Sequence, residues 1–374
     1  MEFSGTIKIT DLNDFLNPSQ DCSVHSSMIK TSTENTAKVS LSDCLACSGC
    51  ITSAETVLLE QHSLDSLKQT LLTTPVAVSI SQQSLLAISS TYNLPLDECY
   101  SLVVGALHSA GVSKVYDMCE ARDIVLQAAA QEFLQKYKEG PLPLLCSECP
   151  GWVCYAEKKA DSCVLPLMSK VKTPMMVQKE IKGIQEYHVA VMPCFDKKLE
   201  AAKEEGVDLV LTTTEIVTFL EELNFTSAQK AEVPCLTSST KFKTASLGYG
   251  EYIFKQAALE LYGSEPQIEV KTTRRRDLLE MECGDLKFCY SSGFQNIQNM
   301  VRQVKRGVSK YHFIEIMACP TGCLNGGGQP KITRDEIKSL EEFMGSLFTE
   351  SLPRVPDLNL QREFKPLEAS NMTW

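Results

Sequence analysis

Two cysteines near the end of the chain, Cys319 and Cys323, lie close together and are followed by three glycines, Gly326, Gly327 and Gly328. Thiolates are soft ligands that select zinc, copper(I) or iron–sulfur clusters over hard cations. If a helix starts here, an i, i+4 spacing lets both thiols face one cofactor. The glycines would let the backbone approach a bulky cluster. The alternative is a buried turn with inert cysteines, since free cysteine is often buried in cores.

A second group of cysteines forms the run Cys44-Leu45-Ala46-Cys47-Ser48-Gly49-Cys50. Three thiols at this double C-x-x-C spacing can bind one cubane [4Fe–4S] cluster from a single tight loop, and the cluster then needs a fourth ligand. Cys22 is the candidate, because no other cysteine precedes Cys99. A zinc knuckle is the alternative, although zinc sites are usually built from two separated pairs of ligands.

Cys149 and Cys194 stand apart from both groups but share their setting with Cys319. Each of the three follows a predicted strand and stands where a helix is expected to begin. Strand C-terminal ends gather on one edge of a parallel sheet, and helix N-termini there favour negatively charged groups such as thiolates. Together with Cys323, these residues could supply the four thiolates of a second cubane site.

The remaining cysteines lack ligand partners at useful spacing and are expected to be ordinary core or surface residues: Cys99, Cys119, Cys146, Cys154, Cys163, Cys235, Cys283 and Cys289. Of these, Cys146 and Cys154 are close enough to Cys149 in sequence to substitute as a ligand. The histidines are scattered, and we expect His188 and His312, which lie in predicted strands, to be structural. The sequence has no P-loop and no G-x-G-x-x-G motif, so it does not indicate nucleotide chemistry.

The elements that must position these cysteines alternate between strands and helices from residue 75 onward. Periodicity and turn residues predict strands at 76–80, 115–118, 142–146, 187–193, 207–212, 268–273, 278–283, 286–291 and 311–317, and helices at 81–91, 95–110, 120–138, 196–204, 214–223, 250–262 and 294–306. This alternation is typical of α/β folds with parallel sheets. We therefore expect two α/β lobes that face one another.

Composition restricts the possible partners and the location of the protein. The net charge of −11 and the pI of about 5.1 argue against a nucleic-acid partner. No apolar stretch is long enough to span a membrane, and the start has no secretory signal, so we expect a cytoplasmic protein and leave a nuclear location open. Sixteen cysteines in such a chain are expected to be ligands or reduced thiols. We divide the chain into an N-terminal [4Fe–4S]-binding region (1–70), a two-lobed domain (71–350) and a C-terminal tail (351–374).

The segments around Cys149, Cys194 and Cys319 resemble the three sequence signatures of the iron-only [FeFe] hydrogenases, and the resemblance covers about residues 75–345. The opening Phe3-Ser4-Gly5, the cysteine run described above and Trp374 make the chain similar to the eukaryotic family of cytosolic iron-only hydrogenase-like proteins, also called the nuclear prelamin A recognition factor-like (NARF) family. This resemblance implies a hydrogenase-type fold and two [4Fe–4S] clusters. It also implies a role in cytosolic iron–sulfur cluster assembly, in which clusters pass from a scaffold complex to a targeting complex and to apo-proteins.

The resemblance also assigns residues. It implies that one cluster is bound by Cys22, Cys44, Cys47 and Cys50, and an inner cluster by Cys149, Cys194, Cys319 and Cys323. Hydrogenases carry a proton-relay cysteine just before the first inner ligand, whereas this chain has Glu148, so we do not expect a hydrogenase. Residues that would contact a hydrogenase's two-iron unit are nevertheless present, namely Met192, Lys197 and Glu200.

Three functions remain in view. The first is an assembly factor whose partners are the scaffold complex and the targeting complex, which contains a WD40 propeller protein. Trp374 is the expected docking residue, because a terminal aromatic residue can be captured in a pocket. The second is a redox enzyme of hydrogenase type, and the third is an interaction protein in the nucleus or cytoplasm whose clusters are structural.

Overall fold

The computed structural model describes residues 59–159, 163–233, 248–264, 266, 271–272, 277–331, 333, 336 and 358–364. All of them belong to one unit, 40–374. The predicted N-terminal ligands Cys22, Cys44, Cys47 and Cys50 lie outside the described residues, and so does Trp374. The predicted domain boundaries therefore stay predictions.

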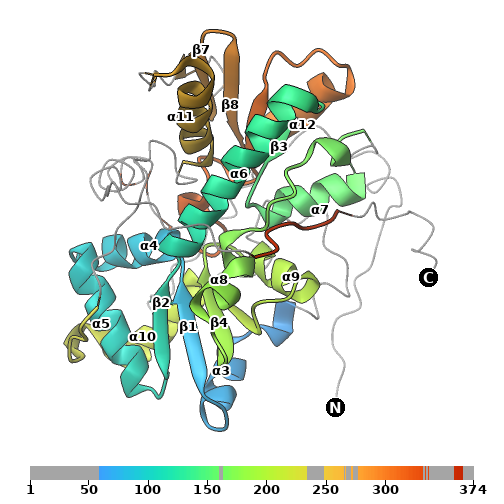
Figure 1. Ribbon diagram of the computed structural model, residues 1–374. Helices are drawn as coiled ribbons and strands as arrows, with labels where there is room; N and C mark the ends of the chain where they lie inside the picture. The colour runs from blue at the N-terminus through green and yellow to red at the C-terminus, as the bar shows by residue number, and fades with distance from the viewer. Residues whose placement is uncertain are drawn as a thin grey trace, which may run out of the picture. The chain divides into compact units, whose positions relative to one another are not determined.

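The first lobe is built on a four-stranded parallel sheet with the order β2-β1-β4-β5 (Figure 1). Its strands are β1 (Val76–Ile80), β2 (Lys114–Asp117), β4 (Tyr187–Met192) and β5 (Leu209–Thr212). One face packs against α3 (Leu64–Leu71), α4 (Gln82–Tyr92), α5 (Leu96–Ser109) and α10 (Thr213–Glu222). The other face packs against α8 (Pro174–Lys182) and α9 (Asp196–Lys203).

Burial on both faces explains why β1, β4 and β5 are largely apolar, whereas the edge strand β2 is partly exposed. In β4, Val189 and Val191 point into the core shared with α4 and α5, whereas Ala190 and Met192 point toward α8. Successive side chains of a strand point to opposite faces, so a strand covered on both sides needs apolar residues at every position. The buried His188 in this strand bonds Gly206 O through Nδ1 at 2.7 Å and Ser79 Oγ through Nε2 at 2.8 Å, as expected of a structural histidine.

The second lobe is built on a five-stranded sheet with the order β3-β9-β8-β7-β6. Its strands are β3 (Leu144–Cys146), β6 (Lys271–Thr272), β7 (Leu278–Cys283), β8 (Leu286–Ser292) and β9 (Phe313–Met317). The expectation of a parallel sheet is wrong here, because β7 runs antiparallel to both β6 and β8. Only Gly284 and Asp285 separate β7 from β8, which is enough for a hairpin but too short for a parallel crossover.

Helices cover both faces of the second sheet. One face packs against α6 (Cys119–Glu139) and α11 (Tyr249–Tyr262), with the rings of Phe288 and Phe313 stacked at 4.6 Å. The other face packs against α7 (Pro150–Lys159) and α12 (Phe294–Lys305). Figure 1 shows α6 starting beside the four-stranded sheet and continuing to the five-stranded one, so this helix connects the two lobes.

The predicted α/β fold with two lobes is confirmed, and most predicted elements match the structure within a few residues. The helix expected after Cys319 is absent, because Thr321 and Gly322 have φ values of 66° and 108°, which a right-handed helix does not allow. A turn and the short 3₁₀ helix η4 (Cys323–Asn325) take its place. Among the described helices, none combines the length and the apolar character needed to cross a membrane.

Candidate metal centre

The four cysteines predicted as the inner ligands line one cavity. Its empty space, including the opening to solvent, is ≈ 660 Å³, and it is lined by Cys149, Cys194, Cys319 and Cys323. The cavity lies beyond the carboxyl ends of both sheets, since its walls follow β1, β2 and β4 in one and β3 and β9 in the other. In the first sheet this is also the point where the strand order reverses between β1 and β4, a common position for ligands in α/β proteins.

Cys149 lies in a short loop between β3 and α7 that is tied to β9. Ser147 Oγ accepts a hydrogen bond from Cys149 N at 3.0 Å and donates one to Ile316 O. The thiol itself accepts a hydrogen bond from Ala318 N at 3.4 Å. Because β3 and β9 are parallel neighbours, these bonds hold the loop of Cys149 beside the loop of Cys319.

Cys194 approaches from the other lobe, between β4 and the start of α9. A Cβ atom on Gly151, in the first turn of α7, would lie 2.6 Å from Asp196 Oδ2, in the first turn of α9. The absence of a side chain at residue 151 therefore leaves room for the Asp196 carboxylate beside the start of α7. Cys149 and Cys194 each lie next to one of these helix starts, where the helix dipole favours negative charge.

The glycine run after Cys323 connects the two lobes. Gly328 N donates to Pro193 O at 2.9 Å, and Thr214 N donates to Gly328 O at 3.0 Å. A Cβ atom on Gly326 would lie 2.3 Å from Pro193 O, and one on Gly328 would lie 2.7 Å from the Thr212 side chain. The sequence predicted that these glycines make room for a cluster. The structure gives Gly326 and Gly328 another role, which is to let the loop of Cys323 pack directly on the loop of Cys194.

Burial raises the pKa values of three of these thiols, those of Cys149, Cys194 and Cys323. Burial, and secondarily the charge of Asp196, raises the pKa of Cys149 to about 11. Burial likewise raises the pKa values of Cys194 and Cys323 well above the ordinary range. The charge of Asp196 is the next cause for Cys194, and the charge of Glu148 is the next cause for Cys323. Since a thiolate is the form that binds metal, loading this site must release protons.

The arrangement of the thiols bears on which metal group fits. Within the ranges that the structure describes, no three or more His, Cys, Asp or Glu side chains are grouped so as to hold a metal ion. Four thiolates on one zinc ion would bring their sulfurs to about 3.8 Å from one another, since Zn–S is ≈ 2.3 Å in a tetrahedral site. A cubane binds one thiolate per iron and so spreads its ligands more widely. A set of four soft donors around a cavity therefore fits a [4Fe–4S] cluster better than a single ion.

Glu148 lies inside the same cavity, with only 6% of the residue exposed. Its Oε1 accepts a hydrogen bond from Gln83 Nε2 at 3.2 Å and lies 3.9 Å from Cys323 Sγ. Burial raises the pKa of Glu148, and this effect outweighs the opposite influence of Lys197 and Arg122. Glu148 is therefore a buried carboxyl group that contacts a predicted ligand.

The other residues predicted to line this region are only partly in it. Met192 and Lys197 line the cavity, whereas Glu200 pairs with Lys197 at 2.6 Å from behind. Burial would lower the pKa of Lys197, but the charges of Glu200 and Glu148 raise it. Thr173 Oγ1 donates to Glu200 Oε1 at 2.6 Å and fixes the pair in place.

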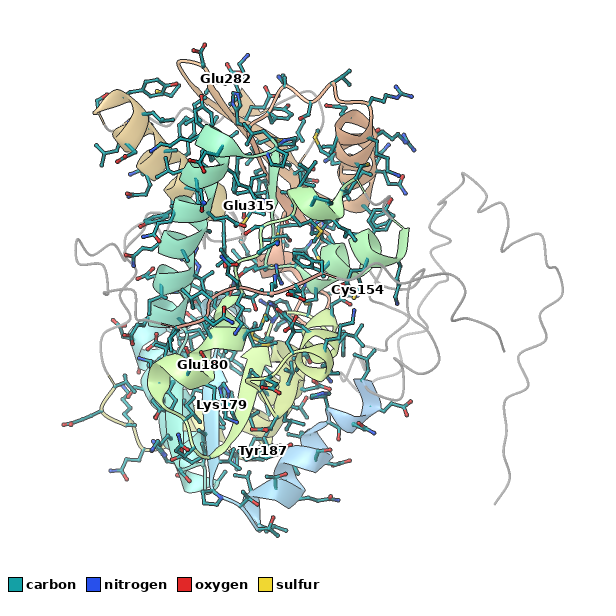
Figure 2. All side chains as sticks on the ribbon, turned by 45° about the vertical axis from the view of Figure 1, so that its right-hand side comes forward. Cys154, Lys179, Glu180, Tyr187, Glu282 and Glu315 are labelled. Atoms are coloured by element: carbon teal, nitrogen blue, oxygen red, sulfur yellow. The ribbon has the colours of Figure 1, made fainter. Side chains whose placement is uncertain are left out.

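Sequence reasoning did not single out several cavity residues, namely Ser81, Gln82, Gln83, Met118, Arg122, Met175 and Met317. The available signal was position, because Ser81, Gln82 and Gln83 directly follow β1 as Cys194 follows β4. Cys154, a possible substitute ligand by its place in the sequence, projects from α7 and is labelled in Figure 2. It lines a separate cavity of ≈ 370 Å³, and Lys203 Nζ lies 3.8 Å from its sulfur. Neither Cys154 nor Cys146 lines the cavity of the four cysteines.

Known proteins resemble this chain over most of its length. Residues 74–327 match the family described as "Iron only hydrogenase large subunit, C-terminal domain". Protein NAR1 of Arabidopsis thaliana is 39% identical over 399 residues, covering 88% of this chain and 84% of that protein. Cytosolic iron-sulfur assembly component 3 of Mus musculus is 35% identical over 429 residues, covering 95% of this chain and 90% of that protein. A solved variant of the [FeFe]-hydrogenase HydA1 from Chlamydomonas reinhardtii has the same fold, with a TM-score of 0.65 and 23% identity over 78% of this chain and 91% of that one.

Proposed function

The chain belongs to the family of iron-only hydrogenase-like proteins that includes the cytosolic iron–sulfur cluster assembly factors, and from this premise we propose that it acts in cytosolic iron–sulfur cluster assembly. The observation that supports this most directly is the convergence of Cys149, Cys194, Cys319 and Cys323 on one cavity from two sheets. The relatives named as assembly factors align with nearly the whole chain, so the proposal applies to the chain over nearly its whole length.

We propose two [4Fe–4S] clusters with different roles. The inner set, Cys149, Cys194, Cys319 and Cys323, would hold a resident cluster that fixes the two lobes together. The N-terminal set, Cys22, Cys44, Cys47 and Cys50, would hold the cluster that is passed on, because three of its thiols lie in one short stretch of sequence. Clusters would be received from a scaffold complex and delivered to the targeting complex and to apo-proteins, in the cytoplasm and in the nucleus.

We propose that the chain is not a hydrogenase. The position before the first inner ligand carries Glu148, whose carboxyl group is fixed by Gln83 and contacts Cys323. A protein loaded with iron and sulfide under anaerobic conditions is expected to show no hydrogen-dependent reduction of a viologen dye. Dye reduction above the level of a Glu148→Ala variant would contradict this part of the proposal.

Iron content tests the proposal as a whole. Reconstituted protein is expected to hold about eight iron atoms per chain, four for each cubane, and to give electron paramagnetic resonance signals of reduced [4Fe–4S] clusters. Cys319→Ala and Cys44→Ala are each expected to reduce the iron content to about four atoms per chain. Cys289→Ala, a buried cysteine of β8 outside the cavity, serves as the control and should leave the iron content unchanged. Stoichiometric zinc in place of iron would overturn the proposal.

We also propose that the side chain of Trp374 anchors the chain to the targeting complex, which contains a WD40 propeller protein. Aromatic anchors of this kind commonly dominate the energy of an interface. Trp374→Ala is expected to abolish co-purification of the targeting complex while leaving the iron content unchanged. Co-purification at the level of the unmodified protein would exclude this docking site.

A further inference from the structure

A segment from the end of the chain, Leu358–Phe364, lies along residues 170–172 in the structure. Val171 and Gln361 form an antiparallel bridge. Lys172 N donates to Leu360 O at 2.8 Å, and Arg362 N donates to Lys170 O at 2.7 Å. Figure 1 draws this segment in dark red. Its backbone is therefore paired with the chain just before α8.

The segment turns alternate side chains toward the protein. Leu360 and Arg362 are buried, whereas Gln361 and Glu363 are exposed. Leu360 packs in the core beneath α6 and α11, and Phe364 packs in the core beneath α7. Arg362 is only 8% exposed, which is unusual for arginine unless its guanidinium has a partner.

The partner of Arg362 is the loop that carries Cys149. Arg362 Nη2 donates a hydrogen bond to Ser147 O at 3.0 Å. Ser147 is the residue whose hydroxyl group bonds both Cys149 N and Ile316 O. The guanidinium of Arg362 also covers the ring of Phe364 at 4.9 Å. Arg362 thus holds Ser147, the residue whose hydroxyl group fixes the backbone of Cys149.

We infer that Leu358–Phe364 is a strap that positions Cys149 through Arg362. The backbone pairing fixes the strap, and the charged hydrogen bond from Arg362 holds Ser147 so that the Cys149 loop stays closed. The strap and α7 also share the walls of the smaller cavity, where Arg362 and Phe364 face Pro150 and Val153. The inference rests on the proposed function only in calling Cys149 a cluster ligand, and it makes that ligand dependent on the C-terminal segment.

Thiol labelling of the iron-free, full-length protein tests the strap. A short pulse of iodoacetamide, followed by peptide mass spectrometry, gives the alkylation rate of each cysteine. In Arg362→Met we expect Cys149, now 7% exposed, to react about tenfold faster, since a hydrogen bond from a charged donor is worth at least that factor. Cys194, which is equally buried but belongs to the other lobe, should keep its rate.

Two further variants distinguish positioning from general support of the fold. Arg362→Lys keeps a charged donor on a flexible side chain, so the alkylation rate of Cys149 should rise by less than about threefold. Gln361→Ala changes an exposed neighbour on the same segment and should change no rate. An unchanged rate at Cys149 in Arg362→Met, or an equal increase at Cys149 and Cys194, would overturn the inference. The assay needs no iron, so a failure to find clusters would count against the proposed function and not against the strap.

Discussion

Replacing Gly326 by alanine should separate the loops of Cys194 and Cys323. Residue 326 has φ −63° and ψ 152°, which alanine adopts readily, so the substitution tests space alone. The new Cβ atom would lie 2.3 Å from Pro193 O and 3.1 Å from Cys323 O. Because such carbon–oxygen contacts normally begin near 3.3 Å, one loop must move by about 1 Å.

A movement of this size should affect stability and iron content in different ways. Overpacking costs about 2 kcal/mol of unfolding free energy, which corresponds to a fall of about 3 °C in the melting temperature of the iron-free protein. Metal–ligand distances tolerate only about 0.2 Å of error, so Cys194 and Cys323 could not both remain bonded to one cluster. We therefore expect Gly326→Ala to lose about four iron atoms per chain, the content of one cubane.

The assay is thermal unfolding by circular dichroism together with iron determination after anaerobic reconstitution. Gly307→Ala is the matched control, since Gly307 has a φ of 64° and open space around its Cα, in the turn after α12. Alanine in this left-handed conformation costs about 1–2 kcal/mol, so the control should lose similar stability and no iron. Equal iron content in the parent and in Gly326→Ala would refute the reasoning, as would equal iron loss in both variants.

Two other expectations follow from the charges and pKa values. Burial raises the pKa of Cys149 to about 11, so its proton is bound more tightly in the folded state. This thiol alone should therefore reduce the unfolding free energy of the iron-free protein by about 2–3 kcal/mol as the pH rises from about 9 to about 11. Urea unfolding across this range should show that the unfolding free energy depends less on pH in Cys149→Ser than in the parent. Equal slopes of unfolding free energy against pH in the two proteins would contradict the raised pKa of Cys149. Lys198 Nζ lies 2.6 Å from Glu215 Oε1 and 2.7 Å from His62 O, with Lys198 buried and Glu215 partly exposed. Lys198→Met should therefore cost about 2 kcal/mol of unfolding free energy and lower the melting temperature by about 3 °C without iron loss, and a melting temperature within 1 °C of the parent would show that this pair contributes little.

Local patterns predicted the parts of the site that depend on strand ends. Cys149, Cys194 and Cys319 follow strands whose apolar residues were evident in the sequence. Parallel pairing of β3 with β9 brings Cys149 and Cys319 to a common edge, whereas Cys194 follows β4 of the other sheet. The antiparallel β7–β8 hairpin was also predictable, because two residues including glycine between two strands are typical of a hairpin. The alternation of strands and helices along the chain favours a parallel sheet, and the hairpin between β7 and β8 is the local exception to it.

Features that depend on distant partners could not be predicted. Gly326 is constrained by the carbonyl oxygen of Pro193, which lies in the other lobe, so its sequence neighbours gave no indication of the reason. Arg362 contacts a residue that precedes it by 215 positions, in a segment with little periodicity. The same holds for Arg122, which lies near the start of the helix predicted at 120–138 and lines the cavity because α6 starts beside it.

The four cavity cysteines are divided unequally between the sheets. Cys149, Cys319 and Cys323 extend from the five-stranded sheet, and Cys194 alone extends from the four-stranded sheet. With all four bound to one cluster, parting the sheets would break a single iron–sulfur bond and leave the other three intact. The five-stranded sheet would then keep the cluster through its three cysteines, and Cys194 would be the ligand that is released. If the proposed inner cluster is present, the unequal division would therefore make the lobe of the five-stranded sheet the one that retains it.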